Sequence, residues 1–121
     1  MDKAEAQGPM IKIIVLHSLR DEIYKTFKKE SLKVYSLMEA LKANPSKGKV
    51  LGHVGSVSIR ELKYESFRFY FILDGHRLIL FSKGKIEELL IRFVKMSKKN
   101  HQQKTIDEIK AILKAVGEGG F

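Results

Sequence analysis

The sequence predicts an α+β fold: an N-terminal strand and a helical hairpin, an antiparallel twisted sheet of four to five strands, and a C-terminal helix. Three patterns predict it. A β-branched run occupies residues 11–16, apolar residues recur at helical spacing from 19 to 41, and phenylalanines alternate between 67 and 71. With 121 residues, 44% of them hydrophobic, the chain can bury one modest core. We therefore expect one domain with its helices on one face of the sheet.

The domain boundaries follow from local composition. Residues 1–9 have no apolar periodicity and end in Gln-Gly-Pro before a second methionine, which is typical of a tag or disordered segment. We expect the domain to span residues 10–117 and the glycine-rich tail 118–121 to be frayed. No window approaches eighteen apolar residues, which excludes a membrane span. The absence of cysteine excludes disulfides and thiol chemistry and is compatible with a cytoplasmic location.

The first half of the chain predicts a strand and two helices. Ile11 and the run 13–16 are dense enough for a buried strand. Ser18 and Asp21 have the spacing of a capping box, so we expect the first helix to open there. The polar cluster 28–30 interrupts the apolar stripe and predicts a hairpin of two helices, the second of which ends at Asn44-Pro45-Ser46.

A loop rich in glycine and lysine follows the helices. Gly48, Gly52 and Gly55 are spaced around Lys47 and Lys49, a composition that is found in phosphate-binding loops. A P-loop, however, needs Gly-Lys-Ser/Thr opening a helix after a strand, whereas here Lys-Gly-Lys follows a helix. We therefore exclude a P-loop and predict a plain loop.

The second half predicts successive hairpins. Residues 57–64 alternate with a phase slip near Arg60-Glu61 that a β-bulge would explain, and residues 67–73 alternate between two faces. Asp74-Gly75 is a strong hairpin signal, after which strands are expected at 77–81 and 89–96. Thr105 and Glu108 have capping-box spacing for the terminal helix, which Gly117 ends. The central sheet should then be an antiparallel meander.

Positive charge is concentrated in the middle of the chain. The formal net charge is +9, and residues 47–104 hold thirteen of the 23 basic residues but only five of the 14 acidic ones. Lysine-rich surfaces are common in themselves. Their concentration in one segment favours a polyanionic partner, either nucleic acid or an acidic protein.

Chemistry that depends on metals or on a serine nucleophile has no support in the motifs. The four histidines lack the spacing of zinc ligands, and no Gly-x-Ser-x-Gly nucleophile elbow is present. No paired carboxylates accompany the basic segment, which disfavours a metal-dependent nuclease. We expect no metal and no small-molecule cofactor.

The remaining candidates are cations on the predicted sheet and on the loop after it, with Tyr70 on the same strand face as Arg68. If these cations converge in a groove, they could hold a scissile phosphate and stabilise the charge of its transition state. His101, Tyr70 or a lysine could then transfer protons as the RNA 2′-hydroxyl attacks the phosphate. The alternative is a solvated face on which Arg68 and Arg92 pair with nearby glutamates. The cations concerned are Arg60, Lys63, Arg68, Arg92, Lys95, Lys98, Lys99 and Lys104.

The order of four short motifs resembles a known superfamily. These are Arg-Glu-Leu-Lys at 60–63, Phe-Arg-Phe-Tyr-Phe at 67–71, Phe-Val-Lys-Met-Ser-Lys-Lys at 93–99 and Glu-Ile at 108–109. In this order they resemble the RelE/ParE superfamily of toxins from toxin–antitoxin modules, in particular its HigB and phage-derived branch. The motifs cover residues 56–116. Lys63 stands where the branch usually has arginine, and Met96 interrupts its double lysine.

The resemblance implies a RelE-like fold and a ribosome-dependent endoribonuclease that cleaves messenger RNA without a metal. It implies cytoplasmic action, the ribosome and messenger RNA as partners, and silencing by a cognate antitoxin protein. The catalytic candidates it favours are Arg68, Tyr70, Lys95 and His101. The candidates for RNA contact are Arg60, Lys63, Arg92, Lys98 and Lys99.

Two further functions stay open at this point. A ParE-like protein would inhibit gyrase and cut no RNA. Alternatively the basic sheet binds nucleic acid or an antitoxin without any turnover, in which case Arg68→Ala weakens binding and its salt dependence only.

Overall fold

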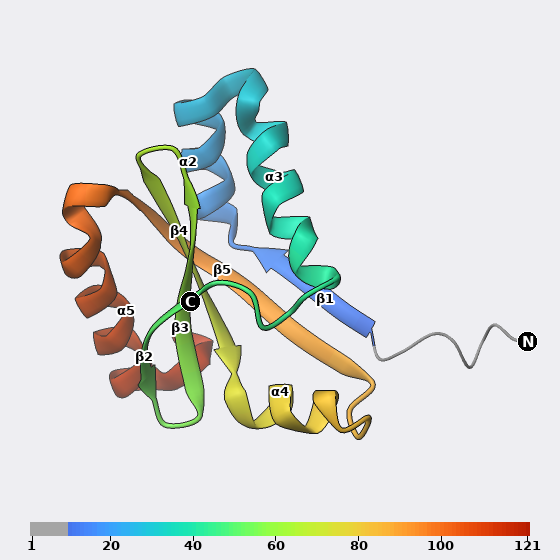
Figure 1. Cartoon of the computed structure of the whole chain (residues 1–121). Coiled ribbons are helices and arrows are strands. Elements are labelled where there is room, and N and C mark those ends of the chain that lie inside the picture. The colour runs from blue at the N-terminus through green and yellow to red at the C-terminus, as the bar shows by residue number, and fades with distance from the viewer. Residues whose placement is uncertain (1–9) are drawn as a thin grey trace, which may run out of the picture.

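The computed structural model describes residues 10–121, which form a five-stranded mixed sheet with helices on both faces (Figure 1). The segment 1–9, expected to be a tag or disordered, lies outside the described residues. No helix among residues 10–121 is long and apolar enough to cross a membrane. The main elements are β1 (Met10–Val15), α2 (His17–Phe27), α3 (Ser31–Glu39), β2 (Lys49–Val54), β3 (Val57–Tyr64), β4 (Phe67–Asp74), α4 (Gly75–Ser82), β5 (Glu88–Lys98) and α5 (Gln102–Val116).

The strands lie in the order β1-β5-β4-β3-β2. The four strands from β2 to β5 are antiparallel, as expected, but β1 pairs parallel to β5, from Met10 opposite Glu88 to Val15 opposite Phe93. The chain passes from β1 through the helical hairpin to the far edge of the sheet. It then returns strand by strand, so that β5 arrives beside β1 in the same direction. The sheet is therefore mixed rather than wholly antiparallel.

Two apolar clusters lie on opposite faces of the sheet. Phe69, Phe71 and Leu73 of β4 pack toward α2 and α3, whereas Tyr70 and Ile72 pack toward α5. The alternation predicted for β4 is confirmed. The expectation that all helices share one face is wrong, because the apolar stripe of α5 covers the face opposite the helical hairpin (Figure 1). This second layer explains why β4 is buried on both sides.

The segment expected to return from a hairpin at Asp74-Gly75 is helix α4. The Asp74 carboxylate accepts hydrogen bonds from the backbone N–H groups of His76 and Arg77, at 3.0 and 3.4 Å. Asp74 thus acts as an N-cap and not as a turn residue. The predicted strand 77–81 is wrong because its continuous apolar run fits a helix as well as a strand.

The Gly/Lys segment expected to be a loop contains the edge strand β2. Its ladder with β3 slips between Val50 and Gly52, so the bulge foreseen near Arg60 lies on the partner strand. A second irregularity occurs where Tyr70 and Phe71 of β4 pair with Lys95 and Phe93 of β5. Both bulges increase the local twist of the sheet.

The predicted helical hairpin is confirmed, although the expected capping boxes are not used. Helix α2 begins at His17 without a side-chain cap, and α5 begins at Gln102, three residues before Thr105. The Thr105 hydroxyl instead donates back to the His101 carbonyl at 3.2 Å. The last residues, expected to be frayed, form a short 3₁₀ turn at Gly117–Gly120, and Phe121 packs against the apolar cluster under α5.

Candidate nucleic-acid interface

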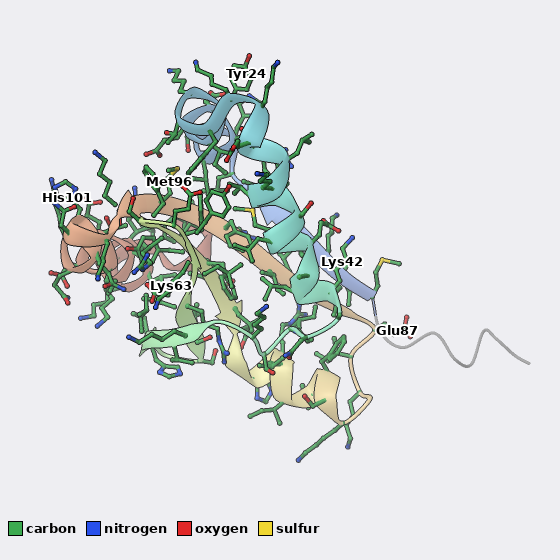
Figure 2. All side chains as sticks on the ribbon, turned by 45° about the horizontal axis from the view of Figure 1, so that its top comes forward. Tyr24, Lys42, Lys63, Glu87, Met96 and His101 are labelled. Carbon is green, nitrogen blue, oxygen red and sulfur yellow. The ribbon has the colours of Figure 1, made fainter. Side chains whose placement is uncertain are left out.

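A cleft of about 480 Å³ opens between α2, the end of β5 and the start of α5. Its two walls come from elements far apart in the sequence, and the sheet end forms its base. Met96 and His101, labelled in Figure 2, mark its base and its α5 wall. The cleft is lined by Glu22, Thr26, Phe67, Met96, Ser97, Lys98, His101, Lys104, Thr105 and Glu108.

Three cationic or titratable nitrogen side chains meet at this cleft: Lys98 from the last residue of β5, His101 from the turn after it, and Lys104 from the first turn of α5. The N-terminus of α5 lies at the same place, and the helix dipole adds partial positive charge there. The local chain reversal at 99–101 is fixed because the Lys99 N–H donates to the Ser66 carbonyl at 2.8 Å. The cleft is thus suited to an anion such as a phosphate.

Glu22 on the α2 wall was not among the residues singled out from the sequence. Partial desolvation at the cleft raises the pKa of its carboxyl, and the nearby Lys95 ammonium opposes that rise. Glu22 and Thr26 lie one helical turn apart, so they share the face of α2 that borders the cleft. A sequence pattern can place them on one face, but it cannot show that this face meets α5.

Tyr70 reaches the cleft only through another side chain. Its ring is fully buried, and its hydroxyl lies 2.8 Å from the hydroxyl oxygen of Ser97, which lines the cleft. Burial raises the pKa of the Tyr70 phenol. Ser97 in turn donates to the Lys98 carbonyl at 2.9 Å, when its proton points that way. The expected placement of Tyr70 beside Arg68 on one strand face is therefore met, but Tyr70 stands behind the cleft wall.

Arg68 is enclosed in the protein, its side chain only 7% exposed. Its Nε lies 3.9 Å from Glu61 Oε1, and its Nη1 donates to the carbonyls of Phe67 and Glu65 at 3.0 and 3.3 Å. The same Glu61 oxygen accepts a hydrogen bond from the Gln102 amide on α5. This arrangement corresponds to the alternative in which Arg68 pairs with a glutamate. The guanidinium ties β3, β4 and α5 together and does not face the cleft.

Two other arginines are also engaged away from the cleft. Arg60 Nη1 donates to the Ser46 carbonyl at 2.8 Å and its Nε to the Ser58 hydroxyl at 3.1 Å, and desolvation lowers the pKa of its guanidinium. Arg92 Nη1 donates to the Glu118 carbonyl at 2.9 Å. Arg60 therefore holds the loop before β2, and Arg92 holds the C-terminal turn.

The remaining lysine candidates lie in or next to the cleft, with one exception. Lys95 pairs with Tyr70 in the ladder and is close enough to act on Glu22. Lys99 lines a neighbouring hollow together with Lys98. Lys63 lies in a separate hollow beside the start of β2. Of the nine predicted residues, the structure thus places Lys98 and His101 in the cleft, Lys99 in the adjoining hollow and Lys95 near Glu22.

Among residues 10–121, no group of three histidine, aspartate or glutamate side chains could hold a metal ion. The cleft contains two carboxylates, Glu22 and Glu108, on opposite helices. Together with Lys98 and Lys104, these carboxylates give the cleft both acid–base groups and cations.

Comparison with known proteins identifies a similar fold in one solved structure. A chain in the crystal structure of the archaeal RelE–RelB complex from Pyrococcus horikoshii OT3 matches with a TM-score of 0.54 and 12% sequence identity, covering 74% of this chain and 96% of that one. No family model and no curated protein matches the sequence. The protein thus has a RelE-like fold, which confirms the fold class predicted from the sequence.

Proposed function

We propose that this protein is the toxin of a toxin–antitoxin module, a metal-free endoribonuclease that cleaves messenger RNA on the ribosome in the cytoplasm and is silenced by a cognate antitoxin. Two things support the proposal. The matched chain comes from a RelE–RelB complex. The cleft gathers Lys98, Lys104 and His101 opposite the Glu22 carboxyl, and this gathering is the observation that carries the proposal.

The cleft can accommodate a complete transesterification. The RNA 2′-oxygen loses its proton to Glu22 or His101 and attacks the adjacent phosphorus. The bond from phosphorus to the 5′-oxygen breaks, and the other of these two groups returns a proton to that oxygen. The products are a 2′,3′-cyclic phosphate and a 5′-hydroxyl. Lys98 and Lys104 neutralise the charge that builds up on the phosphate oxygens.

Arg68 and Tyr70 act in this proposal as positioning residues. Tyr70 holds Ser97 at the base of the cleft, and Arg68 holds Glu61, which anchors α5 through Gln102. Neither side chain reaches the RNA. Lys95, Lys98, Lys99 and His101 keep the contacts proposed for them from the sequence.

Primer extension on a translated messenger RNA tests the proposal. We expect wild-type protein to introduce cuts within the translated region and to leave plasmid supercoiling unchanged. His101→Ala and Glu22→Gln should each reduce the cleavage rate by about 10²–10⁴-fold, the usual contribution of a general acid or base. Lys42→Gln, on α3's side of the molecule and far from His101 in Figure 2, is the matched control. Intact transcripts with wild-type protein would contradict the proposal.

The pH dependence of cleavage separates the two candidate bases. Because the pKa of Glu22 is raised, a Glu22 base is protonated at a higher pH than a free glutamate, and cleavage falls on acidification below that pKa. The Glu22→Gln variant should lose this acidic limb. If the limb persists in Glu22→Gln and disappears in His101→Ala, His101 is the base.

A second candidate function is nucleic-acid binding without cleavage. The burial of both Arg68 and Tyr70 favours it, because two of the four catalytic candidates have no access to a bound strand. In that case the Glu22 and His101 variants should leave all transcripts as wild-type protein leaves them. The Lys98→Gln/Lys104→Gln variant should still weaken RNA binding.

A further inference from the structure

We infer that a second stretch of the RNA strand binds outside the cleft, in a lysine-rimmed hollow between α3, the start of β2 and the end of β3. This inference rests on the proposed function and extends its substrate site. It assigns a role to Lys47 and Lys49, the lysines of the Lys-Gly-Lys sequence that does not match a P-loop. Both remain suited to phosphate contact as side-chain cations.

The hollow has a volume of about 430 Å³. Leu37 of α3 and Leu62 of β3 supply apolar surface, and Lys47, Lys49 and Lys63 line it with cations. An apolar surface bordered by ammonium groups is suited to a base that lies against carbon while its phosphates face the lysines. The other lining residues are Gly48 and Glu61.

The three lysines have no carboxylate partner in the described part of the chain. Within residues 10–121, none of them forms an ion pair closer than 4.0 Å. The carboxylate of the lining residue Glu61 is already paired with Arg68 and hydrogen-bonded to Gln102. A polyanion that enters the hollow therefore meets cations without having to displace an internal partner.

The backbone that carries Lys47 and Lys49 is held in place. Gly48 has a φ of +104° and lies so close to the Phe71 ring that a Cβ would come within 2.9 Å of it. Arg60 clamps the same loop through its 2.8 Å hydrogen bond to the Ser46 carbonyl. The backbone between the two lysines is thus held by the Phe71 ring and by Arg60, which reduces the entropy lost when a ligand binds.

A row of residues across the sheet end connects the hollow to the cleft. Lys63 of β3 pairs with Arg68 of β4, which pairs with Ser97 of β5 at the base of the cleft. Two strand spacings place Lys63 about 10 Å from Ser97. Figure 2 shows Lys63 and His101 toward the same side of the molecule, away from Lys42 and Glu87.

A third hollow adjoins the cleft. It is lined by Ser66, Lys98, Lys99 and Asn100, and it shares Lys98 with the cleft. Ser66 belongs to the turn between β3 and β4, three residues after Lys63, so this hollow extends the cleft toward the end of β3. A single strand bound in the cleft can thus follow Lys98 and Lys99 toward the strand that carries Lys63.

The test compares RNA length and salt dependence. Single-stranded RNAs of 4 and 16 nucleotides are titrated with the full chain by fluorescence anisotropy at several salt concentrations. The hollow variant is Lys47→Gln/Lys49→Gln/Lys63→Gln. The control, Lys12→Gln/Lys83→Gln/Lys85→Gln, removes the same charge from exposed positions on β1 and the turn before β5. The cleft variant is Lys98→Gln/Lys104→Gln.

We expect the hollow variant to bind the 16-mer at least tenfold more weakly and to bind the 4-mer as wild type does. Each phosphate contact to a single strand contributes about 0.7 to the slope of log K against log salt. The 16-mer slope should thus become shallower by about 2, three times that contribution. The cleft variant should weaken both RNAs, and the control should leave the 16-mer slope unchanged.

Three results would overturn the inference. The first is an equal effect of the hollow and control variants on the 16-mer. The second is an equal loss for both RNA lengths in the hollow variant. The third is a hollow variant that no longer binds a polyglutamate probe but keeps the wild-type salt slope for the 16-mer. This result would assign the hollow to an acidic protein. If wild-type protein binds neither RNA, the proposed function itself fails.

Discussion

The Tyr70 hydroxyl and the Ser97 hydroxyl lie 2.8 Å apart, joining a fully buried aromatic ring to the base of the cleft. The two residues belong to neighbouring strands, and Arg68, two positions before Tyr70, is the ladder partner of Ser97. The cleft base is therefore continuous with the core under α5. Changes in that core are expected to move the groups at the cleft.

The buried phenol makes stability sensitive to alkali. The pKa of Tyr70 is raised in the folded state. The protonated phenol therefore contributes fully to the free energy of unfolding below the unfolded-state pKa, which is near 10. This contribution is lost as the pH rises through the pKa of the folded state. Urea unfolding from pH 8 upward should show wild type losing stability above about pH 10. Tyr70→Phe should cost about 1 kcal/mol at neutral pH and should lose less at alkaline pH. Parallel pH curves for the two proteins would contradict this.

Arg68→Ala should destabilise the fold by about 3–5 kcal/mol, because it leaves Glu61 charged and buried without its partner. Urea denaturation measures the loss. Glu61→Gln combined with Arg68→Met removes both charges and keeps an oxygen acceptor for Gln102, so it should recover most of the stability. A double variant as unstable as Arg68→Ala would show that the guanidinium acts through its carbonyl contacts instead.

Asp74→Ala should destabilise the protein by about 1 kcal/mol through loss of the α4 N-cap. Asp74→Asn retains an acceptor oxygen for His76 and Arg77, so its thermal midpoint should stay close to that of wild type. If the two variants melt at the same temperature, the cap contributes little.

Gly48→Ala should cost about 1–3 kcal/mol, because it combines a left-handed backbone with a contact to the Phe71 ring. Gly55 also has a positive φ, but a Cβ there would meet nothing within 4 Å. Gly55→Ala therefore measures the backbone cost alone. Equal unfolding free energies for the two variants would exclude a steric role for Phe71.

The strands whose side chains alternate could be predicted from the sequence, and those that depend on tertiary pairing could not. Four aromatic residues between 67 and 71 define β4, since β-branched and aromatic residues suit a pleated surface. The edge strand β2 contains Gly52 and mostly exposed side chains, so its strand character comes from pairing with β3. The parallel pairing of β1 likewise depends on tertiary structure, because it requires β5 to lie beside β1.

The candidate site was predicted in part, and the difference lies in burial. Lys98, Lys99 and His101 lie in a polar run at and just after the end of a strand, where side chains are expected to face solvent. Arg68 and Tyr70 sit in an aromatic strand whose second face is closed by α5. Only the position of α5 decides whether that face is a groove or a core. The start of α5 also forms the cleft wall opposite Glu22. No local sequence pattern could reveal that Glu22 borders a cleft.

The parallel pairing of β1 with β5 affects the order of events during synthesis. β1 is translated before the other described strands, yet within residues 10–121 it pairs only with residues 88–93 of β5, the last of those strands to be translated. Until they leave the ribosome, the nascent chain holds an unpaired β-branched strand, with the aggregation hazard of an exposed edge. Closing this contact spans most of the chain, so it is expected to govern how fast the protein reaches its native state.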